Sequence, residues 1–155
     1  MNKSAPESVP YKVGDSDQRP WGHYIVTAVG LNDQGEEYCE KDITVKPAQI
    51  LSLQSHKLRR EHWTVKTGVL TVIVDGRRMT LSAGEDVRIP EGGIHCMANL
   101  AAEDCVVHEM QEGTCREEDI IRYLDAYRRA PDDHDGAAAA DSVALYRDIL
   151  SQLGL

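Results

Sequence analysis

The sequence lacks the features that mark secreted or membrane proteins. Its four cysteines, Cys39, Cys96, Cys105 and Cys115, form no CxxC pair and no spacing typical of a disulfide framework, which favours free thiols in a reducing compartment. No basic start precedes an apolar run, and no stretch approaches the roughly 18 apolar residues that a membrane-spanning helix needs. We therefore expect a cytoplasmic protein without a membrane partner.

Positive charge is also in short supply. The chain has 17 Lys and Arg against 26 Asp and Glu, a formal net charge of -9 and a pI near 5.1. Nucleic acids attract basic surfaces, so we expect no nucleic-acid partner. A small anionic ligand is compatible with the sequence, because Lys57, Arg59 and Arg60 form a local basic cluster.

What the sequence has in abundance is short stretches of alternating apolar and polar residues. With 155 residues it can form one domain with its own core. Asp75-Gly76, between two alternating stretches, is the clearest hairpin signal. Many short strands at this spacing predict an all-β fold, a jelly-roll barrel. The predicted strands are 21–29, 38–45, 51–56, 62–67, 69–74, 77–81, 86–89, 95–99 and 105–111.

The two ends differ from this pattern. Residues 1–18 are polar and predict an N-terminal arm, and 19–130 form the predicted barrel domain. After residue 116 the apolar spacing becomes helical, and residues 131–141 are a predicted linker before an amphipathic helix over 142–154. That helix is expected to cover its own domain, with a dimer interface as the alternative. The helical spacing rests on Ile120, Ile121, Leu124 and Tyr127, then on Val143, Tyr146, Ile149, Leu150 and Leu153.

Four nitrogen and oxygen donors predict a metal site inside the barrel. Gln54 and His56 are two residues apart, so on a strand they share one face. Glu61 opens the next alternating stretch, and His95 follows a turn marked by proline and glycine. Cys96 adjoins His95 but faces the opposite way on a strand, so a buried thiol is expected there, not a fifth ligand.

These residues also carry a family resemblance. The segment 51–63, LSLQSHKLRREHW, resembles the LSLQxHxxRxEHW segment of type II phosphomannose isomerases, which are cupins. Three further landmarks of that family follow the same order, and the resemblance covers about residues 19–129. The landmarks are Arg19-Pro20-Trp21-Gly22-His23-Tyr24, Ile89-Pro90 to Asn99, and Glu118-Asp119-Ile120-Ile121-Arg122 with Asp125 and Tyr127.

The resemblance implies a fold and a reaction. It implies a cupin double-stranded β-helix with C-terminal helices, and Zn²⁺ held by Gln54, His56, Glu61 and His95. The donor chemistry also allows Fe²⁺, Mn²⁺ or Ni²⁺. The implied reaction of carbohydrate metabolism interconverts mannose 6-phosphate and fructose 6-phosphate through an enediolate. By analogy with other cupins we expect a homodimer.

The isomerase hypothesis needs a base and a phosphate site. Glu109 is the candidate base, with a structural hydrogen bond as the alternative; parity puts either Glu109 or His108 inside the barrel. His62 should face away from the ligands. Arg59 is the candidate for phosphate and catalysis, since its fork can bind two oxygens. The weaker substrate-binding candidates are Arg60, Lys57, Arg116 and Lys46, and Trp63 is expected to stack on a sugar or, more simply, to pack in the core.

Departures from the family pattern keep other functions open. Ala48 and Arg128 stand where the family usually has Gly, Arg60 where it has Ala, and Cys96 where it has Arg. The alternatives are a non-enzymatic sugar-binding or regulatory cupin and a metal-dependent cupin oxidoreductase such as an iron dioxygenase. No Gly-rich phosphate loop precedes residue 19, so we expect no guanylyltransferase activity from this chain.

Overall fold

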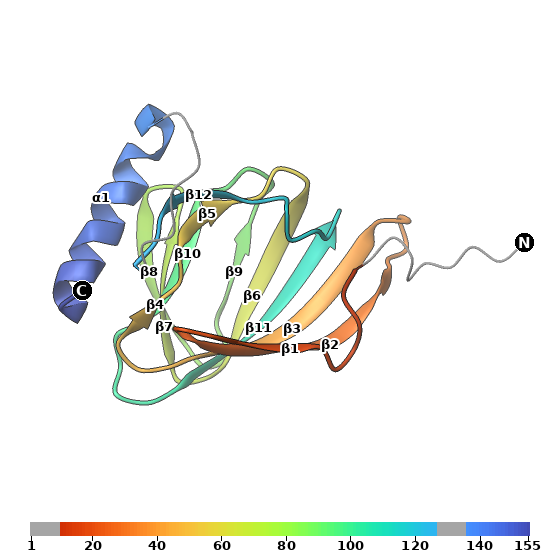
Figure 1. Cartoon of the computed structure of the whole chain (residues 1–155), viewed down its shortest axis with the longest axis horizontal. Helices are drawn as coiled ribbons and strands as arrows, with labels where there is room; N and C mark the ends of the chain where they lie inside the picture. The colour runs from red at the N-terminus through yellow and green to blue at the C-terminus, as the bar shows by residue number, and fades with distance from the viewer. Residues whose placement is uncertain (1–9, 127–135) are drawn as a thin grey trace, which may run out of the picture.

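Two antiparallel β-sheets face each other and a helix covers the outer face of one of them (Figure 1). This computed structural model describes residues 10–126 and 136–155. The first sheet has the order β1-β2-β3-β11-β6-β9. Its strands are Ser16–Arg19 (β1), Gly22–Leu31 (β2), Glu37–Val45 (β3), Arg59–Thr67 (β6), Asp86–Ile89 (β9) and Cys105–Gly113 (β11).

The second sheet has the order β12-β5-β10-β7-β8, and β4 also pairs with β10. Its strands are Gln49–Ile50 (β4), Leu53–Ser55 (β5), Val69–Val74 (β7), Arg77–Ser82 (β8), His95–Asn99 (β10) and Ile121–Leu124 (β12). The predicted barrel is thus confirmed, and each predicted strand has its counterpart. Asp75 and Gly76 have φ of 47° and 78°, as a two-residue type I′ turn requires, and they join β7 to β8 as predicted.

The core between the sheets comes from the inward-facing half of each alternating strand. Along β3 every second residue from Cys39 to Val45 is buried: Cys39, Ile43 and Val45 are apolar, and Lys41 at the same phase is charged. Ala48, in the turn after β3, has φ of 62°, a left-handed backbone that favours the glycine usual in the family. The main apolar cluster contains Trp21, Ile43, Val45, Trp63, Val65, Leu70, Val72, Leu81, Ile89, Met97, Cys105 and Val107.

Helix α1 (Gly136–Leu153) packs on the outer face of the second sheet (Figure 1). Ala139, Ser142, Tyr146 and Ile149 lie three or four residues apart and are buried, and the Tyr146 hydroxyl donates to the Leu51 carbonyl at 2.9 Å. The predicted C-terminal helix is confirmed and begins at residue 136, inside the predicted linker; 131–135 lie outside the described residues. None of the helical segments described here has the length and apolar character to cross a bilayer.

Two local predictions need correction. The helix predicted around Ile120 to Leu124 is wrong, because residues 121–124 form β12 and pair with β5; Tyr127 lies outside the described residues. The boundary of the N-terminal arm at residue 18 falls within β1, which pairs with β2. Tyr11, within that arm, is buried at 7 % exposure, and residues 1–9 are outside the described part of the chain.

Candidate metal centre and pocket

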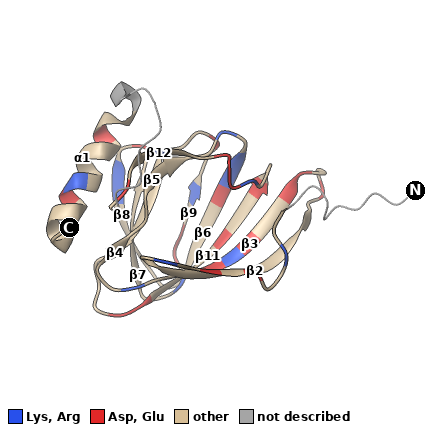
Figure 2. Cartoon of the chain, in the orientation of Figure 1, with Lys and Arg blue, Asp and Glu red and all other residues tan. Residues whose placement is uncertain are grey.

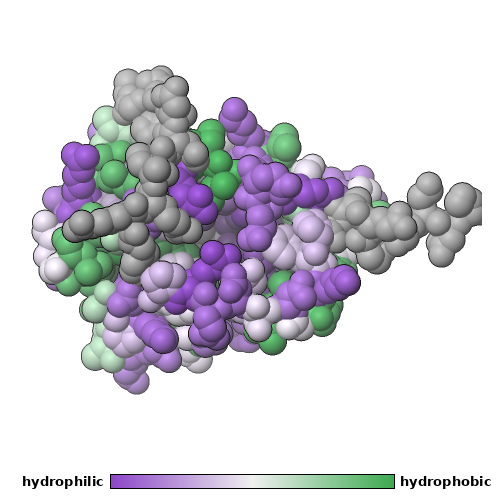
Figure 3. Space-filling view, in the orientation of Figure 1, coloured by the Kyte–Doolittle hydropathy of each residue, from purple (hydrophilic) through white to green (hydrophobic). Residues whose placement is uncertain are grey.

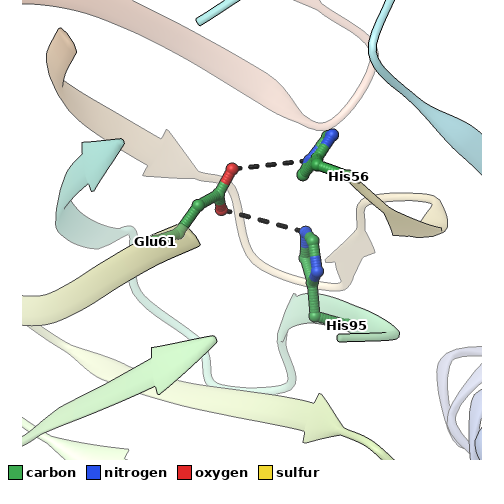
Figure 4. A group of neighbouring side chains, drawn as sticks. All are labelled: His56, Glu61 and His95. Atoms are coloured by element: carbon green, nitrogen blue, oxygen red, sulfur yellow. Dashed lines mark ion pairs between the residues drawn. The ribbon is translucent and has the colours of Figure 1, made fainter. Parts of the chain in front are cut away.

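His56, Glu61 and His95 converge from three parts of the barrel (Figure 4). Glu61 lies on β6, His95 on β10, and His56 directly after β5. His56 Nε2 lies 3.4 Å from one Glu61 carboxylate oxygen, and His95 Nε2 lies 3.8 Å from the other. All three side chains are buried, and their donor atoms lie within 4.8 Å of one another, a grouping that can hold a metal ion.

Hydrogen bonds fix the protons of both imidazoles. His56 Nδ1 lies 2.6 Å from the Asp119 carbonyl, and His95 Nδ1 lies 3.0 Å from the Gly93 carbonyl. A carbonyl only accepts, so each Nδ1 carries the proton and each Nε2 offers a lone pair. Burial lowers the pKa of both histidines despite the Glu61 carboxylate, which keeps the rings neutral. Among the buried side-chain atoms described, His95 Nε2 has no hydrogen-bond partner, which fits a metal ligand.

The Glu61 carboxylate is held on both oxygens. One accepts the Trp63 indole N–H at 2.9 Å, and the other accepts Arg59 Nε–H at 2.9 Å. Burial alone would raise the pKa of Glu61, but the positive charge of Arg59 lowers it, so the carboxylate stays ionised. Two neutral imidazoles and one carboxylate are a donor set that suits zinc and other divalent ions.

Gln54 lies on the same inner face as these three residues. It is directly opposite His95 in the pairing of β5 with β10, and it lines the adjoining pocket. Its side-chain oxygen accepts a hydrogen bond from the Ser52 hydroxyl at 3.0 Å. Gln54 as a fourth ligand stays a prediction. Cys96 points instead into the apolar cluster beneath α1, which confirms the predicted buried thiol.

Asp119 orders the turn that carries His56, a role that the sequence did not reveal. Its two carboxylate oxygens accept the backbone N–H groups of Lys57 and Leu58, each at 2.9 Å, while its carbonyl holds His56. The segment 118–122 was recognisable as a family landmark, but its contact with a turn about sixty residues earlier comes only from the tertiary fold.

A pocket of about 360 Å³ opens beside this group, between the two sheets. Glu109 on β11 lines it and is buried, so the choice between Glu109 and His108 that strand parity left open is resolved in favour of Glu109. Gln111 donates to Glu109 at 2.7 Å. Burial and the nearby Glu61 charge raise the pKa of Glu109. His108 and His62 face outward and bind Asp42 and Asp86 respectively, at 2.9 and 2.6 Å.

Of the basic residues predicted to bind substrate, Arg59 lines the pocket and the others do not. Arg59 lines the pocket and touches Glu61 and His56, but Arg60 faces outward and pairs with Glu36 at 2.7 Å. Arg116 pairs with Glu37, and Lys57 is exposed over a different surface hollow. The expectation that Arg60, Lys57 and Arg116 share the substrate site is therefore corrected, because none of the three lines this pocket. Strand parity turns Arg60 outward toward Glu36, Glu37 holds Arg116, and Lys57 is exposed in the turn before β6. The weaker candidate Lys46 is also exposed and does not line the pocket.

Trp63 is buried at 1 % exposure and packs edge-on against His95, with ring centroids 5.4 Å apart. It does not line the pocket. The simpler expectation of core packing is therefore confirmed, and the stacking role against a sugar is not supported by this position. Its indole N–H also donates to Glu61, so Trp63 helps to position the metal group, by which we mean the three candidate ligands His56, Glu61 and His95.

The pocket contains cations that the sequence analysis passed over. Its lining includes four cationic side chains and only two carboxylic ones, although the whole chain is acidic. Figure 2 shows acidic and basic bands on β3 and β6 and acidic bands on β11, and many hydrophilic residues border the recess between the sheets in Figure 3. One signal was available in the sequence: Lys41 occupies a buried phase of β3. The lining cations are Arg19, Lys41, Arg59 and Arg122, and the acids are Glu109 and Glu117.

Comparison with solved structures places the fold among cupins. A KdgF structure from Halomonas sp. superposes with a TM-score of 0.56 over 66 % of this chain and 86 % of that one, at 16 % identity. Oxalate decarboxylase OxdC from Bacillus subtilis superposes with a TM-score of 0.58 over 70 % of this chain and 29 % of its own, at 17 % identity. At these identities the likeness concerns the fold alone.

Sequence relatives narrow the family. The chain is 39 % identical over 112 residues to a mannose-1-phosphate guanylyltransferase of Escherichia coli K12, covering 72 % of this chain and 22 % of the relative. It is 38 % identical to the alginate biosynthesis protein AlgA of Pseudomonas aeruginosa, with the same coverage. The chain thus spans about a fifth of the length of these relatives. The family described as mannose-6-phosphate isomerase C-terminal matches residues 9–126. The chain belongs to this family.

Proposed function

We propose that the protein is a metal-dependent aldose–ketose isomerase that interconverts mannose 6-phosphate and fructose 6-phosphate or a related sugar phosphate. The observation that carries the proposal is the position of Glu109, an inward carboxyl group in the pocket beside His56, Glu61 and His95. The family and the cupin fold support a sugar-phosphate isomerase-like protein. We expect zinc in the site, held by these three residues and Gln54.

A divalent ion bound there would polarise the sugar carbonyl and favour negative charge on its oxygen. Glu109 acts as the base: it takes the proton from C2 of the aldose, giving an enediolate, and returns a proton to C1 of the ketose. The proton of the C2 hydroxyl moves to the C1 oxygen, so the reaction balances without an oxidant. Gln111 orients Glu109 through its 2.7 Å hydrogen bond.

Arg59 acts on the reacting end of the sugar in this proposal. Its guanidinium donates to Glu61 and to the Arg116 carbonyl and lies 3.1 Å from His56 Nε2, so it is fixed beside the metal group. A fixed cation there stabilises the developing enediolate and orients Glu61. The expectation that Arg59 binds the phosphate fits this geometry less well, because Glu61 and the Arg116 carbonyl already accept from its Nε and Nη1 and its Nη2 lies beside His56, at the centre of the site.

Glu109→Gln tests the proposal, because the amide keeps the shape of the side chain and cannot accept the proton. We expect kcat for mannose 6-phosphate to fall by about 10²- to 10⁴-fold while bound metal per chain is unchanged. Glu112→Gln is the matched control, since Glu112 lies on the same strand but does not line the pocket. A coupled assay of fructose 6-phosphate formation measures both. Wild-type-like turnover by Glu109→Gln, or no turnover by metal-loaded wild type, contradicts the proposal.

A further inference from the structure

Lys41 is an unusual residue for a barrel interior. It is only 7 % exposed, although it lies at the inward phase of β3 between Cys39 and Ile43. A buried lysine normally pairs with a carboxylate, because a lone charge loses its hydration. Throughout the described part of the chain, no hydrogen bond or ion pair reaches its ammonium. Lys41 lines the pocket, so an anionic ligand can supply the missing partner.

Aromatic side chains hold this ammonium in place. Lys41 Nζ lies 4.1 Å from the centre of the Tyr11 ring and 4.5 Å from that of Tyr24. Such contacts stabilise a cation while leaving its N–H groups available to oxygen acceptors. Arg19, a partly exposed residue at the end of β1, lines the same pocket as Tyr24 and Lys41. Arg19 also forms ion pairs with Asp17 at 2.9 Å and with Glu117 at 3.8 Å.

The position of Lys41 relative to the reactive groups follows from strand pairing. On the inner face of the first sheet, Trp63 is opposite Glu109 across β6 and β11, and Glu109 is opposite Lys41 across β11 and β3. Glu109 therefore lies on the strand between β6, which carries Glu61, and β3, which carries Lys41. A ligand with its carbonyl end near His56 and Glu61 passes Glu109 before it reaches Lys41.

We propose that Lys41, together with Arg19 at the edge of the pocket, binds the phosphate of the sugar substrate. This inference rests on the proposed isomerase function and assigns the anionic end of its substrate. It also explains why four cationic side chains and only two carboxylic ones line the pocket in a chain whose formal net charge is -9. Arg59 then serves the reacting carbons and Lys41 the phosphate, at the two sides of Glu109.

Isothermal titration of the metal-loaded protein with mannose 6-phosphate and with mannose tests the assignment. Wild type should bind the phosphorylated sugar at least about tenfold more tightly than mannose. Lys41→Met, which keeps most of the length of the side chain and removes its charge, should lose roughly ten- to a hundredfold in affinity for mannose 6-phosphate. Its affinity for mannose and its metal content should match wild type. Lys46→Met, at an exposed lysine outside the pocket, is the matched control and should behave as wild type.

A second variant guards against a folding defect. Arg19→Gln changes a side chain that is 31 % exposed, so it should fold, and we expect a severalfold loss of affinity for mannose 6-phosphate alone. Full affinity for mannose 6-phosphate in both Lys41→Met and Arg19→Gln, or equal binding of the two sugars by wild type, overturns the assignment.

Turnover separates the two proposals. If wild type isomerises mannose 6-phosphate and Lys41→Met keeps the same KM, the phosphate assignment fails and the isomerase stands. If wild type binds mannose 6-phosphate through Lys41 without converting it, the isomerase fails and the anion site stands.

Discussion

At the scale of single residues, the metal group depends on where two protons lie. Backbone carbonyls hold the Nδ1 protons of His56 and His95, so both Nε2 lone pairs face Glu61. Trp63 and Arg59 hold the two carboxylate oxygens in turn. Each ligand is thus positioned by a second residue, which limits how far the remaining ligands can compensate when one is removed.

His95→Ala should abolish metal retention. Removing one buried imidazole leaves an incomplete set of donors, so we expect less than a tenth of the wild-type zinc per chain after dialysis, measured by inductively coupled plasma mass spectrometry. His62→Ala is the control, since His62 faces outward and binds Asp86. Stoichiometric zinc in His95→Ala would remove His95 from the site.

The sequence placed the candidate metal ligands on one inner face but misplaced most of the basic residues, for a physical reason. Gln54, His56 and Glu61 lie in one short segment, where strand parity can be counted from the sequence. The sequence predicts one basic cluster at Lys57, Arg59 and Arg60, but β6 already begins at Arg59. From that residue onward neighbours alternate, which sends Arg59 inward and Arg60 toward Glu36.

At the scale of elements, the turn between β5 and β6 carries His56 and depends on Asp119. Asp119→Ala removes both acceptors for the Lys57 and Leu58 N–H groups. We expect the turn to loosen and zinc affinity to fall about 10- to 100-fold, as for other residues that orient metal ligands. Competition with a zinc-binding dye measures the affinity. The exposed Asp104→Ala is the control, and an unchanged zinc affinity in Asp119→Ala would show that the turn does not need this carboxylate.

On the outer face of the first sheet, His108 is hydrogen-bonded between two carboxylates, and its contribution to stability should depend on pH. Burial alone would lower the pKa of His108, but hydrogen bonds to Asp42 and Glu40 at 2.9 and 2.8 Å raise it. A raised pKa stabilises the fold fully below the unfolded value of about 6.5, and the gain disappears as pH rises through the folded value.

His108→Gln should therefore cost several tenths of a kcal/mol, up to about 1, near pH 5 and much less near pH 9. Urea unfolding at both pH values measures the difference. His23→Gln, on β2 and outside this cluster, serves as the comparison. A cost for His108→Gln that stays constant or grows toward alkaline pH would contradict the sign.

Strand prediction succeeded where alternation was long and failed at β12. Nine predicted strands rest on regular period-two patterns, and Asp75-Gly76 fixed one hairpin from its turn chemistry. Ile120, Ile121 and Leu124 also fit a helical period. β12 has only four residues, which are too few to tell a helical period from the alternation of a strand. The strand exists because β5 offers an edge, with a shifted register between Arg122 and Leu124. That partner lies far away in the sequence.

At the scale of the whole molecule, the pocket is a product of long-range pairing. Because β3 and β6 both pair with β11, Glu109 is directly opposite Lys41 on one side and Trp63 on the other. Because these residues are far apart in the sequence, their proximity cannot be predicted from it. Lys41 was therefore not predicted as a site residue, whereas Gln54, His56 and Glu61, which lie close together in the sequence, were. The homodimer, the cytoplasmic location and the choice of zinc over iron, manganese or nickel stay predictions.

The central claim is that this chain isomerises a sugar phosphate with one metal ion at His56, Glu61 and His95. Metal-depleted protein titrated with Zn²⁺, with conversion of mannose 6-phosphate to fructose 6-phosphate measured at each addition, tests it most directly. We predict that activity is absent without metal, rises linearly and reaches a plateau at about one equivalent of zinc per chain. Activity that persists after metal removal, or no conversion at any loading with zinc, iron, manganese or nickel, would contradict the claim.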